Sequence, residues 1–92
     1  MDVEIRLFAT FREAVGQKTI TREFDASVTV GEVLEALESE FDGLAGNILD
    51  GDELQPQLNI LKNGRDVSHL DGLEEPLDPG DRLSVFPPVA GG

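Results

Sequence analysis

The sequence predicts an α+β domain in which one main helix packs on a mixed sheet of four to five strands. Three observations support this prediction. Segments of alternating apolar and polar residues occur in both halves of the chain, one amphipathic segment with helical spacing lies between them, and an Asn-Gly pair marks a tight hairpin in the second half. One apolar helix stripe and one apolar sheet face can bury each other, so the pattern indicates two packed layers.

The predicted first strand, residues 3–8, alternates between apolar residues and a second set of Glu4, Arg6 and Phe8. Because successive side chains on a strand point to opposite faces, Phe8 should lie on the face away from the helix. Residues 9–16 are expected to form a loop or one helical turn. The inward set of the strand is Val3, Ile5 and Leu7.

Residues 18–24 form the predicted second strand. Ile20, Arg22 and Phe24 share one of its faces, and the residues between them share the other. Since the first face mixes an arginine with two apolar residues, the sequence leaves open which face is buried.

The main helix has clear start and stop signals. Thr29 is a good N-cap, and Glu32 three residues later completes a capping box. Asp42 and Gly43 are expected to end the helix. Four glutamates lie mostly off its apolar stripe, which consists of Val30, Val33, Leu34, Leu37 and Phe41.

The second half is expected to begin with a polar connection, residues 44–56, that includes at most a short helical turn. Residues 58–62 read as a strand, and Asn63-Gly64 predicts a type I′ turn into a short return strand, residues 65–67. After a further connection, residues 82–86 form the last strand, with Phe86 pointing away from the helix.

That last strand is placed at the centre of the sheet, beside the first strand, where it would anchor whatever follows it. We therefore divide the chain into a domain, residues 1–86, and a flexible extended tail, residues 87–92. Pro87 and Pro88 favour a stiff, extended exit, and the two final glycines let a partner close tightly around the backbone.

The composition narrows the classes of function. The chain has no cysteine and carries a formal charge of −12, which argues against thiol chemistry, nucleic acid and anionic membranes. The acidity indicates either a basic partner or, preferably, solvation in a salty cytoplasm. No secretion signal or membrane span is evident, so we expect a soluble, cytoplasmic protein.

Four stretches resemble one known family: residues 5–16, residues 29–34, residues 58–64 and, most specifically, residues 86–92 with the sequence FPPVAGG. The family is that of the small sulfur-carrier subunit of molybdopterin synthase and its archaeal relatives, the small archaeal modifier proteins. The resemblance covers nearly the whole chain. It implies the β-grasp, or ubiquitin-like, fold, and the acidic composition resembles that of salt-loving archaeal members.

The resemblance also implies a chemistry. An E1-like partner that uses ATP and Mg²⁺ adenylates the carboxylate of Gly92. A lysine of a target protein then attacks to form an isopeptide bond, or sulfur displaces the nucleotide to leave a thiocarboxylate for molybdopterin (molybdenum cofactor) synthesis or tRNA thiolation. We favour the protein modifier, with the sulfur carrier as the alternative and a non-covalent interaction module as a third possibility.

The chain itself is then a substrate and not an enzyme, with no bound cofactor or metal, and we expect a monomer. Besides the E1-like enzyme and target lysines, the resemblance admits the large subunit of molybdopterin synthase and a deconjugating metalloprotease as partners. The residues assigned to these roles are Gly92 for activation, Gly91, Pro87 and Pro88 for tail recognition, Phe8 and Phe86 for partner docking, and Lys18 and Lys62 as acceptors for self-conjugation.

Two further motifs are assigned no chemistry. His69 has no second histidine or cysteine with which to bind a metal. The acidic residues 50–53 lack the ligand spacing of an EF-hand and indicate a solvated loop.

Overall fold

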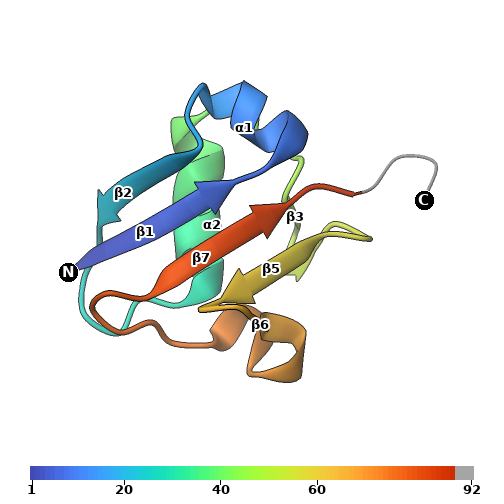
Figure 1. Cartoon of the computed structure of the whole chain (residues 1–92). Helices are drawn as coiled ribbons and strands as arrows, with labels where there is room; N and C mark the ends of the chain where they lie inside the picture. Colours follow the sequence, from blue (N-terminus) through green and yellow to red (C-terminus); the bar gives the residue numbers. More distant parts are fainter. Residues whose placement is uncertain (89–92) are drawn as a thin grey trace.

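The computed structural model describes residues 1–88, and it has the predicted α+β architecture (Figure 1). A mixed five-stranded sheet lies in front of the main helix, α2 (Val30–Glu40), in the view of Figure 1. The strands of this sheet are β1 (Asp2–Leu7), β2 (Thr19–Glu23), β5 (Asn59–Lys62), β6 (Arg65–Asp66) and β7 (Arg82–Phe86).

The strand order is β2-β1-β7-β5-β6, which confirms that the last strand lies at the centre beside the first. β7 runs parallel to β1, with Ile5 opposite Leu83, and antiparallel to β5, with Ile60 opposite Val85. The chain therefore leaves the sheet from a strand that is hydrogen-bonded on both sides.

The predicted capping box of α2 is present. The Thr29 hydroxyl accepts a hydrogen bond from the Glu32 amide at 3.2 Å, and the Glu32 carboxylate accepts one from the Thr29 amide at 2.9 Å. The helix ends at Glu40, and Phe41 is its C-cap. These local bonds satisfy backbone donors that the first turn leaves free.

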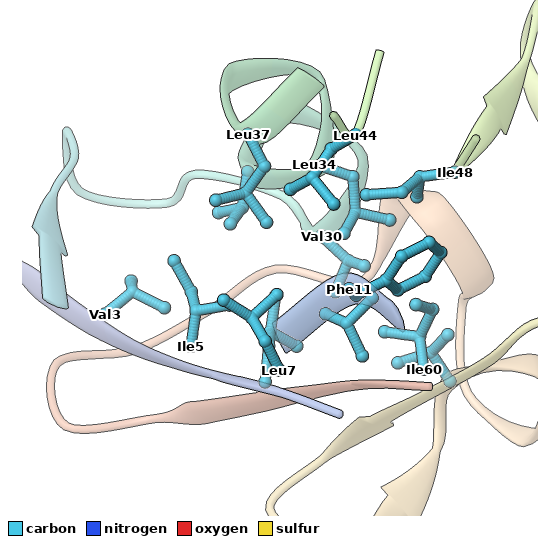
Figure 2. Close-up of a cluster of buried hydrophobic side chains, with 14 of the residues drawn as sticks. Val3, Ile5, Leu7, Phe11, Val30, Leu34, Leu37, Leu44, Ile48 and Ile60 are labelled. Carbon is cyan, nitrogen blue, oxygen red and sulfur yellow. The ribbon is translucent and has the colours of Figure 1, made fainter. Parts of the chain in front are cut away.

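Side chains of β1 point toward those of α2 and form one core with residues from the rest of the chain (Figure 2). Burial of these side chains determines the register of the sheet, because a slip by one residue would turn the apolar side chains to solvent. Its fully buried members include Val3, Ile5, Leu7, Val30, Leu34, Leu37, Leu44, Ile48, Ile60, Leu83 and Val85.

The sequence left open which face of the second strand is buried. In the structure, the even-numbered side chains of β2 face α2. Ile20 is buried, and Arg22 reaches the helix, where its Nε donates to the Glu40 carboxylate at 2.8 Å. The guanidinium also lies 5.8 Å from the centre of the Phe41 ring. An arginine is thus tolerated on the inward face because its head meets a carboxylate at the rim of the core.

The prediction of a loop or a single helical turn after the first strand is wrong, because residues Ala9–Val15 form a helix of seven residues, α1. Its Phe11 is buried in the core, and Gly16, with φ +85°, caps its C-terminus through an N–H bond to Arg12. Burial of Phe11 stabilises a segment whose apolar residues are too few to show a stripe.

The connection of residues 44–56 also differs from the expectation, because it contains a hairpin of β3 (Leu49–Asp50) and β4 (Glu53–Leu54). Glu38 of α2 holds it: one carboxylate oxygen accepts hydrogen bonds from the amides of Ile48 and Leu49, at 2.9 and 2.8 Å. These two bonds join Glu38 to residues ten and eleven positions away, so a local sequence pattern does not reveal them.

The return strand is shorter than expected. Asn63 and Gly64 have φ of +50° and +86°, as a type I′ turn requires. Val67, however, belongs to the 3₁₀ helix η1 (Val67–His69) because the Asp66 side chain accepts a bond from the Ser68 amide at 2.9 Å. A second 3₁₀ turn, η2 (Gly72–Glu74), follows.

Replacing Gly43 by alanine should lower the free energy of unfolding by about 1 kcal/mol or more, since overpacking forces neighbours to move. A Cβ at this position would lie 2.8 Å from the Cβ of Ala14 in α1. Denaturant unfolding measures the effect. In a double-mutant cycle, Ala14→Gly should reduce the cost of Gly43→Ala, and an unchanged cost would contradict the contact.

Candidate functional site

The candidate site is the root of the C-terminal tail. Phe86 is the last residue of β7, and Pro87 and Pro88 follow it directly. β7 lies between β1 and β5, so the direction in which the chain leaves the sheet is fixed by the core. The predicted reactive residues Gly91 and Gly92 lie outside the described residues.

The structure brings the two predicted docking residues together. Phe8 continues β1 in an extended conformation, with φ −127° and ψ +151°, and serves as the N-cap of α1. Its ring stacks on that of Phe86, with a centroid distance of 4.1 Å and an interplanar angle of 12°. By strand alternation both rings belong to the face opposite α2, and both are half-buried.

An open, mostly apolar hollow of about 430 Å³ lies at this stack. It joins the C-terminal end of β7 to the start of α1, two segments that are far apart in the sequence. Three of its lining residues, Ala9, Thr10 and Asn59, were not marked as functional by the sequence, although the alternation of residues 58–62 places Asn59 on the Phe86 side. The lining is Phe8, Ala9, Thr10, Asn59, Phe86, Pro87 and Pro88.

The two lysines differ in their surroundings. Lys62 is 16% exposed, and its Nζ donates to Glu75 at 2.7 Å and to the Pro76 carbonyl at 2.9 Å. The hydrogen bond to Glu75 raises the pKa of Lys62 above its usual value, and desolvation opposes this only in part. The side chain of Lys18 is exposed. Only a deprotonated, accessible amine attacks an acyl group, so the geometry favours Lys18 as an acceptor.

Amine-reactive labelling checks this difference. We expect Lys18 to react several times faster than Lys62 near pH 8, because Lys62 must first release its carboxylate and carbonyl partners. Peptide mass spectrometry during the time course gives both rates. Glu75→Gln should speed the labelling of Lys62 and leave Lys18 unchanged; equal rates for the two wild-type lysines would contradict the proposed protection.

The other motifs remain without a chemical role. His69 is exposed in η1, and the acidic residues 50–53 form the β3–β4 hairpin. Across residues 1–88, no three histidine or acidic side chains are gathered in a way that could hold a metal ion. Neither α1 nor α2 has the length and apolar character needed to cross a membrane.

A helix packed on a mixed sheet, with a parallel first and last strand at its centre, is the β-grasp arrangement, so the chain is a ubiquitin-like protein. The chain belongs to the ThiS family, which it matches over residues 5–92. This family membership confirms the predicted resemblance to small sulfur carriers.

Its relatives include both predicted kinds of protein. The chain is 59% identical to small archaeal modifier protein 3 of Haloferax volcanii, with full coverage of both chains. It is 32% identical to the sulfur carrier protein CysO of Mycobacterium tuberculosis, over 84% of this chain and 83% of the relative. The solution structure of the Haloferax volcanii HVO 2177 protein, 59% identical, superposes with a TM-score of 0.92 and covers 100% of this chain and 87% of that one. These names describe modifiers and carriers, in agreement with a chain that is not itself a catalyst.

Proposed function

We propose that this chain is a ubiquitin-like protein modifier that becomes attached to lysines of target proteins through Gly92. The observation that carries the proposal is the tail root: a rigid central strand, β7, runs directly into an uncharged PPVAGG segment. The full-length identity of 59% to a protein named as a small archaeal modifier supports the same function.

The chemistry follows from the poor reactivity of a carboxylate. Its oxygen attacks the α-phosphate of ATP on an E1-like enzyme, and pyrophosphate leaves. The resulting acyl-adenylate has AMP as a good leaving group. A deprotonated lysine amine attacks the Gly92 carbonyl, AMP departs, and loss of a proton completes the isopeptide bond.

The sulfur carrier is the second candidate, supported by the 32% identity to a named sulfur carrier. It shares the activation step, after which a sulfide equivalent displaces AMP and leaves a thiocarboxylate. The large subunit of molybdopterin synthase would be a partner in that use. A deconjugating metalloprotease would be a partner of the modifier.

In both uses the protein acts in the cytoplasm as a monomer. The catalytic groups, ATP and Mg²⁺ belong to the activating partner. Gly91, Pro87 and Pro88 are proposed to be recognised by that partner as an extended segment.

The test uses tagged protein in its native cells, compared with a variant that lacks Gly91 and Gly92. Trypsin cleavage after Arg82 would leave residues 83–92 as a branch on each modified lysine. Branched peptides that vanish in the truncated variant support the modifier, and a thiocarboxylate without branches supports the carrier. Identical results for wild type and truncation would overturn both.

Phe86→Ala tests the proposed docking face. We expect it to lower kcat/KM for ATP–pyrophosphate exchange with the E1-like enzyme at least tenfold, because aromatic anchors in apolar pockets carry much of the energy of an interface. Phe24→Ala, which removes a half-buried ring outside the hollow, is the control and should stay within about threefold of wild type. Equal losses in the two variants would contradict a specific face.

A further inference from the structure

The sheet face opposite α2 carries charged residues beside the Phe8–Phe86 stack. In the register of β1 and β7, Glu4 lies opposite Arg82 and Arg6 lies opposite Ser84. The two rings follow on the same side of these strands. No described element lies over this face in Figure 1, where it is turned toward the viewer.

The Glu4 carboxylate lies close to two arginines on this face, Arg6 and Arg82. The Arg82 Nε donates to Oε2 of Glu4, and the Arg6 Nε lies 3.5 Å from that same oxygen. The Arg6 Nε is buried, yet it has no hydrogen-bond partner among the residues that the structure describes. A guanidinium has five N–H donors, so Arg6 retains most of its capacity for an oxygen acceptor.

Arg6 can be reached from outside. Its side chain is 40% exposed. Phe8 follows it by two residues in an extended chain, so the two positions are about 6.6 Å apart along the strand. A single protein loop can therefore contact Arg6 and the hollow at the rings at the same time.

The net charge of the Glu4, Arg6 and Arg82 cluster is opposite to that of the molecule, although the same face also carries Asp2, Glu23 and Asp66 farther from the rings. The chain carries −12 overall, whereas Arg6, Arg82 and Glu4 together carry one positive charge. An acidic group of a partner is repelled by most of the surface but meets two guanidinium groups here, and this contrast favours one docking orientation.

We propose that the E1-like enzyme docks on this face with a loop that presents a carboxylate to Arg6 and an adjacent apolar side chain to the hollow at Phe8 and Phe86. This inference rests on the proposed function. Arginine suits the role because its planar fork binds a carboxylate through two parallel hydrogen bonds. Direct contact is required in a salty cytoplasm, since 1 M salt reduces the Debye length to about 3 Å.

The test measures ATP–pyrophosphate exchange by the E1-like enzyme of the same genome as a function of modifier concentration. Arg6→Glu should raise KM at least tenfold with little change in kcat, because it disturbs docking and not the tail. Arg6→Lys keeps the charge but loses the fork, and should raise KM a few-fold. The matched control is Arg65→Glu, an exposed position on β6, which should stay within twofold of wild type.

Thermal unfolding of each variant and the dissociation constant of the enzyme–modifier complex separate docking from folding. A folded Arg6→Glu variant with a KM within twofold of wild type would overturn the inference. An equal rise of KM in Arg65→Glu would also overturn it, since only general charge would then matter. A wild-type chain that supports no exchange would overturn the proposed function as well, so the two failures are distinguishable.

Discussion

A chain that ends at Gly91 should lose at least about a hundredfold of the wild-type rate of ATP–pyrophosphate exchange with the E1-like enzyme. Removing Gly92 withdraws the terminal carboxylate by about 3.5 Å, the length of one extended residue. A displacement of about 1 Å from a reacting group can already cost about a hundredfold. The root of the tail cannot shift to make up this length, because Pro87 follows directly on the central strand β7.

A semisynthetic chain that keeps Gly92 but ends in a carboxamide is the matched control. It has the full length and loses only the nucleophilic carboxylate, so it should be equally inactive while binding the enzyme as the wild type does. Both altered chains should unfold at the wild-type temperature. Exchange that persists in the Gly91-terminated chain would show that Gly92 is not the group that is activated.

The sequence predicted those parts of the fold and site that depend on short-range patterns. The capping box at Thr29, the Asn63-Gly64 turn and the apolar alternation of the first and last strands each act within a few residues. The pairing of Phe8 with Phe86 required one long-range step, that these two strands are parallel neighbours.

The missed features depend on contacts between distant segments. α1 forms around the burial of Phe11, and the β3–β4 hairpin is held by the carboxylate of Glu38. Likewise, the Nε of Arg6 has no hydrogen-bond partner within the described chain because the Glu4 carboxylate accepts a hydrogen bond from Arg82 instead, and Arg82 lies 78 residues from Glu4 in the sequence. A sequence pattern shows which side chains share a face, but not which of them form hydrogen bonds or ion pairs with one another.

Removing salt should destabilise the folded protein strongly. The charge of −12 is confined to a domain with a radius of gyration of 12.0 Å. The Debye length is about 30 Å at 0.01 M salt, so the excess negative charges repel one another across the whole domain, whereas at 1 M it is about 3 Å. From Coulomb's law with water as the medium, we expect the free energy of unfolding to fall by on the order of 5 kcal/mol between 1 M and 0.01 M KCl.

Thermal unfolding at a series of KCl concentrations measures this change. The matched variant replaces Glu13, Glu23 and Glu35 by glutamine; these side chains are exposed, and none of the three carboxylates accepts a hydrogen bond within the described residues. With three fewer negative charges, its stability should depend clearly less on salt. An equal dependence in the two proteins would mean that salt acts through the apolar core and not through self-repulsion.

The dependence of stability on pH distinguishes this general repulsion from the contribution of specific ion pairs. Hydrogen bonds from Lys62 and Arg22 lower the pKa of Glu75 and Glu40 in the folded state. Such groups contribute stability above the unfolded glutamate pKa of about 4.3, and that stability is lost as the pH falls through the lowered folded value. In 2 M KCl the stability should therefore stay level from pH 7 to 5 and fall below about pH 4.3. In 0.01 M KCl it should first rise as the pH approaches 5, because partial protonation of the other acids relieves repulsion before the pairs break.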